Sequence, residues 1–180
     1  MTEDELKKLL DEFLSLPSET EWLEFKEAKD NYDFNKLGEY FSALSNEANL
    51  KGKPYGWLIF GIDNKTRNIV GTRYRPHRNN LDSLKLEIAN KTTNRITFME
   101  IHELLLPEGR VIMFQIPDAP KGIPIAWEGH YYGRDGQSIG ALNLQEIEQI
   151  RNQVKNYDWS AQICDGATIH DLNKDAIIKA

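Results

Sequence analysis

The sequence predicts one α+β domain with a mixed or antiparallel sheet of about six or seven strands and about four helices. Three observations support this fold class. Four segments repeat apolar residues at helical spacing, and several short apolar stretches are separated by turns rich in Gly and Pro. In addition, 180 residues with 40% hydrophobic side chains are enough to build one well-buried core.

The four helices follow from apolar periodicity and from residues that start or stop a helix. The first extends to Leu16, and Thr2 can cap it together with Glu5. The second covers residues 34–48 and ends before Gly52 and Pro54. The third is expected at about residues 80–90, and the fourth carries an apolar stripe from residue 144 to residue 154.

The strands are shorter and are recognised from alternation or continuous apolarity. Residues 22–25 alternate, whereas residues 57–62 are nearly all apolar, which predicts a central strand buried on both faces. Hairpins are expected around residues 64–68, 107–109 and 128–129, with strands at 69–71, 96–106, 110–116, 125–127 and 130–132. Residues 133–140 are expected to form a loop.

Charge is distributed unevenly along the chain. The net charge is −6, and residues 1–33 contain eleven acidic and four basic side chains. Residues 64–98 contain eight Lys or Arg and two acids, a local excess of 8 − 2 = +6. Such a segment suits a phosphate backbone, and the alternative is that its charges pair with the acidic first helix.

Other features limit the cellular setting. The sequence has no apolar run of about 18 residues and no basic, then apolar, N-terminus, so we expect a cytoplasmic protein without a membrane segment. The single cysteine, Cys164, cannot form an internal disulfide.

Acidic side chains are expected to meet where the first two strands end. A short strand with acidic residues at its end is followed by a crossover helix. The apolar strand at 57–62 then places Asp63 beside that same end. Carboxylates brought together need a cation, a proton or a basic partner. The alternative is that these acids are solvated and that Asp63 only organises its own turn.

A basic loop, residues 72–79, lies near this point in the chain. It is expected to clamp phosphates with its cationic side chains and to stack on a base with its tyrosine. Arg134 joins the clamp if residues 131–138 lie on the same side. The candidate nucleic-acid-binding residues are Arg73, Tyr74, Arg75, His77, Arg78 and Arg134.

Five motifs in order carry a family resemblance: E-x-x-x-L-E-F-K at 19–26, S-A-L-S-N at 42–46, L-I-F-G-I-D at 58–63, I-V-G at 69–71 and Y-Y-G-R-D-G-Q-S at 131–138. Together they resemble the Schlafen AlbA-2 domain, also called divergent AAA-4. That domain occurs at the N-terminus of bacterial proteins assigned as transcriptional regulators or as relatives of helicases. The resemblance places a Schlafen AlbA-2-like domain at residues 1–158, with an N-terminal helix at 1–17. We expect residues 159–180 to begin a linker or a further C-terminal region that is cut short.

The resemblance implies nucleic-acid binding, to RNA or DNA, and also a metal-dependent endoribonuclease site of three acids. Carried over by position, these acids are Glu19, Glu24 and Asp63, which would hold Mg²⁺ or Mn²⁺. Lys26 would share a strand face with Glu24 and support developing negative charge.

The sequence departs from the family pattern at two places. It lacks the Gly-Gly pair before the central strand, and Asp135 adds an acid beside Arg134. It also has no phosphate-binding loop of the G-x-x-x-x-G-K-S/T type, so ATP hydrolysis is not expected.

Three functional hypotheses follow. The first is a nucleic-acid-binding domain of a bacterial transcriptional regulator or defence protein. The second is the metal-dependent ribonuclease. The third is an interaction module in which the acidic first helix of one copy pairs with the basic segment of another, giving a homo-oligomer.

Overall fold

The computed structural model describes residues 1–16, 20–136, 138–154 and 168. Within these residues the chain forms four α-helices and seven strands, which confirms the predicted α+β class. The helices are α1 (Glu3–Ser15), α2 (Phe34–Leu50), α3 (Arg78–Ala89) and α4 (Leu144–Arg151). The strands are β1 (Leu23–Lys26), β2 (Tyr55–Phe60), β3 (Glu100–Leu106), β4 (Gly109–Pro117), β5 (Ala126–Trp127), β6 (His130–Asp135) and β7 (Ser138–Ala141).

The main sheet has the strand order β1-β2-β4-β3. Strands β1 and β2 are parallel and are joined through α2, while β2–β4 and β4–β3 are antiparallel. Parallel neighbours require such a crossover, because their connection must return to the starting end of the sheet. Strand β2 lies between two partners and is almost wholly buried, as its continuous apolar sequence predicts.

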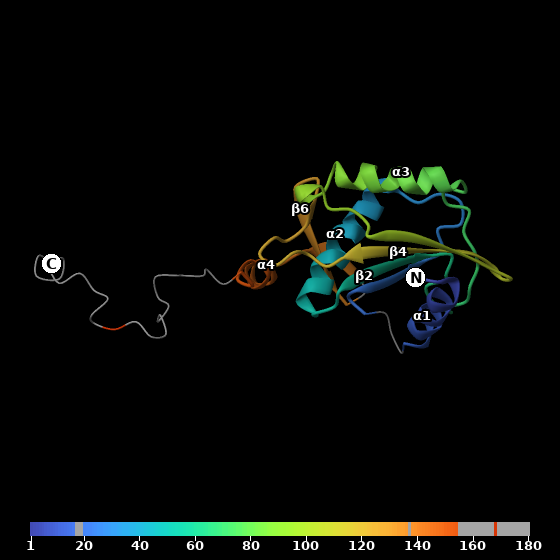
Figure 1. Cartoon of the computed structure of the whole chain (residues 1–180), viewed down its shortest axis with the longest axis horizontal. Helices are drawn as coiled ribbons and strands as arrows, with labels where there is room; N and C mark the ends of the chain where they lie inside the picture. The colour runs from blue at the N-terminus through green and yellow to red at the C-terminus, as the bar shows by residue number, and fades with distance from the viewer. Residues whose placement is uncertain (17–19, 137, 155–167, 169–180) are drawn as a thin grey trace, which may run out of the picture.

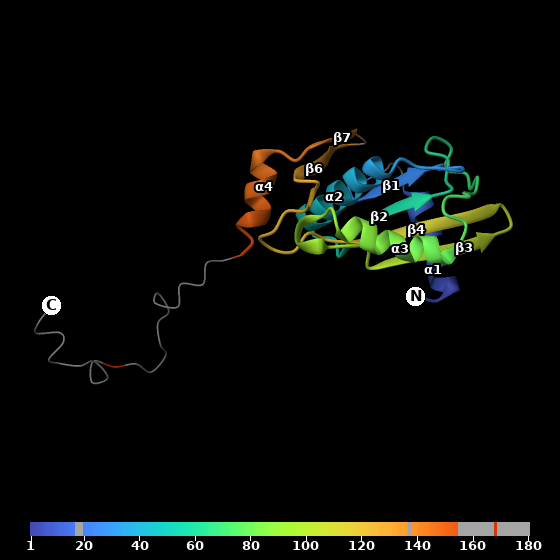
Figure 2. The ribbon, with the colours of Figure 1, turned by 90° about the horizontal axis from the view of Figure 1, so that it is seen from above.

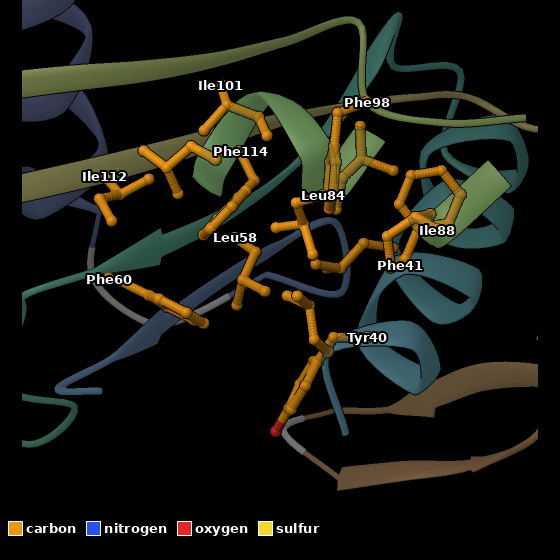
Figure 3. Packing of buried hydrophobic residues seen from close by; sticks show 14 of the residues in the cluster. Tyr40, Phe41, Leu58, Phe60, Leu84, Ile88, Phe98, Ile101, Ile112 and Phe114 are labelled. Carbon is orange, nitrogen blue, oxygen red and sulfur yellow. The ribbon is translucent and has the colours of Figure 1, made fainter. Parts of the chain in front are cut away.

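Helices cover both faces of this sheet (Figures 1 and 2). Trp57 and Ile59 of β2 pack with α1 on one face. Leu58 and Phe60 point to the other face and pack with α2 and α3. Figure 3 shows this second cluster, in which Leu84 of α3 lies near the sheet residues. Alternate residues of β2 therefore contribute to two separate apolar layers, one on each face of the sheet.

A second sheet, β5-β6-β7, packs beside α2. The prediction of a loop at residues 133–140 is wrong, because β6 and β7 form a hairpin there. Gly136 lies in its turn with φ of +63°. The expected strand at residues 69–71 is reduced to one isolated bridge, between Ile62 and Ile69. No helix among the described residues is both long enough and apolar enough to cross a membrane.

Candidate nucleic-acid interface

The ends of β1 and β2 lie side by side, as the sequence predicts. The amide of Gly61 donates to the carbonyl of Lys26 at 2.9 Å. The basic loop flanks this point, because the Arg73 amide donates to the Lys29 carbonyl at 2.6 Å and the Thr72 hydroxyl donates to the Ala28 carbonyl. The two loops that follow β1 and β2 are therefore joined by their backbones.

Glu24 lies within β1, two residues before Lys26, and is 2% exposed. It is opposite Leu58, so its side chain lies on the sheet face covered by α2. Its two carboxylate oxygens accept hydrogen bonds from Lys26 and from Arg134, whose side chain is fully buried. We call Glu24, Lys26, Tyr40 and Arg134 the β1 ionic cluster.

The charged side chains of the β1 ionic cluster pair with one another. Burial disfavours the charged form of Lys26, but hydrogen bonds to Glu24 and Tyr40 outweigh it and raise the pKa of that ammonium group. The Tyr40 hydroxyl lies 3.5 Å from Glu24, and Lys26 lies 4.9 Å from the centre of the Tyr40 ring. Lys26 does share a strand face with Glu24, but it neutralises that carboxylate.

Asp63 has different surroundings. Its Oδ1 accepts from the Thr66 amide at 2.6 Å, the Thr66 hydroxyl at 2.9 Å and the Lys65 amide at 2.9 Å. These hydrogen bonds, led by the one from the Thr66 backbone, lower the pKa of Asp63 from 3.8 to about 2. Asp63 thus organises its own turn, the simpler of the two alternatives for this residue.

The described residues do not assemble the expected metal ligands. Glu19 lies outside the described residues. Glu24 and Asp63 are held by separate partners, and no group of three or more His, Cys, Asp or Glu in the described part of the chain could hold a metal ion. The three-acid site therefore stays a prediction that these carboxylates do not support.

Two arginines of the basic loop are engaged by the fold. Arg75 forms a bidentate pair with Glu87, with both N–O distances at 2.7 Å. Arg78 bonds to Asp82 at 3.0 Å and contacts Glu100 at 3.3 Å. These acids lie on α3 and β3, and in the part of the chain that the structure describes no basic side chain of residues 64–98 forms an ion pair with an acid of α1, so the alternative pairing is not seen there.

Two further candidates are buried away from solvent. Tyr74 is 5% exposed, packs edge-on against Phe60 with ring centres 5.2 Å apart, and has its pKa raised by burial. Its expected role as a stacking ring is wrong, because the ring belongs to the core. Arg134 does not join the basic loop either, since the β6–β7 hairpin points its side chain into the β1 ionic cluster.

The exposed cations lie around an open cavity of about 500 Å³, which we call the cationic cleft. Arg73 is 82% exposed and Lys29 is 70% exposed. Arg73 contacts Asp30 at 2.6 Å, an ion pair that solvent screens. Nearby His77 is exposed and begins the turn into α3. The cleft is lined by Lys29, Asp30, Val70, Gly71, Thr72, Arg73, Pro76, Gly109 and Arg110.

Sequence reasoning missed Lys29 and Arg110. Lys29 lies in the connection between β1 and α2, and its position after β1 and before the crossover helix is the signal that could have placed it beside the basic loop. Arg110 is bound by Glu103 at 2.6 Å and donates to the Tyr74 carbonyl at 2.7 Å. It shapes the wall of the cleft, and nothing in the sequence around it indicates this role.

The floor of the cleft depends on two glycines in close contact. A Cβ on Gly109 would lie 2.7 Å from the Cα of Gly71, and Gly71 has φ of +73°. Neither position has room for a side chain without a backbone shift. The I-V-G motif therefore brings the basic loop against the start of β4.

The solved structures that match this chain include the following two. The DIP2311 protein from Corynebacterium diphtheriae has a TM-score of 0.57 and 19% identity over 97% of this chain, which spans about a third (33%) of that protein. The N-terminal domain of a Nitrosomonas europaea protein described as related to the ATP-dependent DNA helicase RecG has a TM-score of 0.45 and 22% identity, covering 77% of this chain and 90% of that one. No curated protein matches the sequence.

The motifs that suggested a family now have structural positions. S-A-L-S-N lies on α2 and bonds to Tyr132 of β6, L-E-F-K is β1, and the arginine of Y-Y-G-R reaches Glu24 from β6. The family model described as Schlafen, AlbA_2 matches residues 19–143, well over half of the 180-residue sequence. The chain therefore belongs to the Schlafen, AlbA_2 family.

Proposed function

We propose that this domain binds nucleic acid by holding phosphates at the cationic cleft. The observation that carries the proposal is the pair of exposed cations, Lys29 and Arg73, at the mouth of a cavity of about 500 Å³. Three cations and one carboxylate line this cavity. The binding site is thus narrower than the positive segment of the sequence, because Arg75, Arg78 and Lys85 of that segment are used in internal ion pairs.

A phosphate can compete with the internal partner of Arg73. Exposed ion pairs such as Arg73–Asp30 contribute only about 0–1 kcal/mol, so rearranging this pair has a low cost. Binding to a polynucleotide also releases condensed counterions, which drives association at low salt. The guanidinium group is suited to the exchange because its planar donors match phosphate oxygens.

The setting of this activity is also a proposal. We place the domain in a bacterial regulator or defence protein, where it would attach the rest of that protein to RNA or DNA. RNA cleavage has weaker support, because Glu24 is neutralised by Arg134 and Asp63 is held in its turn. Self-association through α1 stays a prediction without a supporting contact in the described part of the chain.

Fluorescence polarisation with labelled single-stranded RNA and DNA at two or more salt concentrations tests the proposal. The variant Lys29→Gln, Arg73→Gln is compared with Lys53→Gln, Lys121→Gln, which removes the same charge from the opposite end of β2 and from the loop after β4. Each lost phosphate contact should reduce the slope of log affinity against log salt by about 1.

We expect the cleft variant to bind at least about tenfold more weakly and with a slope smaller by about 2, while the control variant retains wild-type binding. An equal loss of affinity in both variants would mean that only the net charge of the protein matters, and it would contradict binding at the cationic cleft. Absence of binding by the wild-type protein at low salt would contradict the function.

A further inference from the structure

A second open cavity lies at the other end of α3. It has a volume of about 490 Å³ and is formed by the segment that follows α3 and by the β5–β6 turn. Figure 1 shows α3 lying across one face of the sheet, with the basic loop at its start and this second segment at its end. The lining residues are Asn90, Lys91, Thr92, Thr93, Ala126, Glu128, Gly129 and Tyr131.

The backbone beside this second cavity is strained. Asn94 and Arg95 are consecutive non-glycine residues with φ of +53° and +57°, and Glu128 across the cavity has φ of +47°. Such conformations cost free energy and cluster at functional sites. Arg95 follows the lining residue Thr93 by two positions, is exposed, and forms no ion pair with any residue that the structure describes.

The second cavity carries features that suit a nucleotide. Lys91 lies at its wall and pairs with Glu128, an exposed contact that phosphate can replace. The partly exposed ring of Tyr131 also lines the cavity and offers a face to a base. Only an unpaired base can enter a cavity of this kind, because the bases of a duplex are stacked and paired.

The wall between the two cavities is electrically balanced. Within α3, Arg78 and Lys85 balance Asp82 and Glu87, which gives 2 − 2 = 0 net charge along the helix, and these side chains form ion pairs with one another or with neighbouring residues. Its exposed polar residues include Asn79, Asn80 and Ser83, which can bond to sugars or phosphates. The excess positive charge therefore lies at the two ends of the helix.

We propose that a single strand of nucleic acid runs along α3, with one phosphate in the cationic cleft and another held by Lys91 and Arg95. The inference rests on the proposed function and adds the path and the strandedness of the ligand. The 12 residues of α3 span about 18 Å at about 1.5 Å per residue. A stacked strand advances about 3.4 Å per nucleotide, so about five nucleotides connect the two cavities.

The test measures how affinity depends on oligonucleotide length. Single-stranded oligoadenylates of increasing length, from a dinucleotide to a dodecamer, compete with a labelled dodecamer for the wild-type protein, Arg95→Gln, and Lys29→Gln, Arg73→Gln. Lys121→Gln is the control for loss of one exposed positive charge. Circular dichroism checks that each variant is folded.

We expect wild-type affinity to rise at least about tenfold between the dinucleotide and lengths of about six to eight nucleotides, and then to level off. Arg95→Gln should weaken the longer ligands at least about fivefold and leave the dinucleotide unchanged. The cleft variant should weaken every length.

Longer ligands that bind Arg95→Gln as tightly as wild type, while the cleft variant still weakens them, would overturn the path along α3 and leave the proposed function standing. A duplex dodecamer is included as a further competitor, and tighter binding of this duplex than of its single strand would also overturn the path along α3. If no length binds the wild-type protein, the proposed function itself fails.

Discussion

Arg134 and Glu24 form a buried ion pair between residues 110 positions apart in the sequence. The Arg134 guanidinium also donates to the carbonyl of Leu23 at 2.9 Å, so it bonds both the backbone and a side chain of the β1 segment. Removing one member of a buried pair leaves the other charge desolvated and unpaired, which is strongly destabilising. We infer that this pair fixes the β6–β7 hairpin to the main sheet.

Replacing Arg134 by Met should therefore lower the free energy of unfolding by about 3–5 kcal/mol, measured by urea denaturation. Arg134→Lys should recover only part of this loss, because an ammonium group lacks the planar fork of donors. Arg73→Gln is the matched control and should change stability by no more than about 0.5 kcal/mol. Equal stability of Arg134→Met and wild type would show that the pair is dispensable.

Asp63 gives a pH-dependent prediction. Its folded pKa of about 2 lies below the ordinary 3.8, so its contribution to stability is complete above about pH 4 and is lost as the pH falls toward 2. NMR titration of the Asp63 carboxyl carbon should give a midpoint near 2. Asp63→Asn should flatten the fall in stability over this acid range, and an unshifted midpoint near 3.8 would contradict the turn described here.

At the residue scale, the sequence predicted which side chains carry charge but not which partners they meet. Glu24 and Lys26 were correctly placed on one strand face, yet burial by α2 and the distant Arg134 decides what they do. Tyr74 is a second case. A tyrosine between two arginines is predicted to be exposed, but in the fold its ring packs against Phe60.

At the scale of elements, α2 holds the two sheets together through the S-A-L-S-N motif. The Ser42 hydroxyl donates to the Ile125 carbonyl at 2.7 Å, and the Asn46 amide donates to the carbonyls of Ile125 and Tyr132 at 2.9 Å. The Asn46 side-chain oxygen accepts from the Ile125 amide at 2.7 Å. These side chains satisfy backbone groups that would otherwise be buried without partners.

Gly38 of α2 should be intolerant of any side chain. A Cβ there would lie 2.1 Å from the Trp127 ring, which is itself buried against the helix. We expect Gly38→Ala to reduce the free energy of unfolding by about 1–3 kcal/mol or more, measured by thermal or urea denaturation. Gly140→Ala is the control, because its Cβ would meet only the Asp135 carboxylate at 3.8 Å. A stable Gly38→Ala protein would contradict this packing.

Local rules predicted most elements correctly. The capping box of Thr2 and Glu5 begins α1, and the apolar run of β2 marks the centre of the sheet. The missed strand, β7, has only four residues, including a glycine, so neither alternation nor β-propensity distinguishes it from a loop. Its pairing with β6 is a tertiary effect.

For the whole molecule, the fold class could be predicted because the residues of both apolar layers recur at helix or strand spacing in the sequence. The interface could be predicted only in part. The positive segment and the neighbouring strand ends were correct, but internal ion pairs neutralise Arg75 and Arg78, while Lys29 completes the cationic cleft from a different loop. Net charge along a segment does not reveal which charges remain accessible to a ligand.

The most direct test of the central claim is an NMR titration of the labelled protein with a single-stranded RNA octamer at low salt. We predict that the largest amide shifts occur at residues 71–73 and at Gly109 and Arg110, and that added salt reverses them. Shifts confined to the opposite end of β2, around Trp22 and Lys53, or no shifts at any amide, would contradict phosphate binding at the cationic cleft.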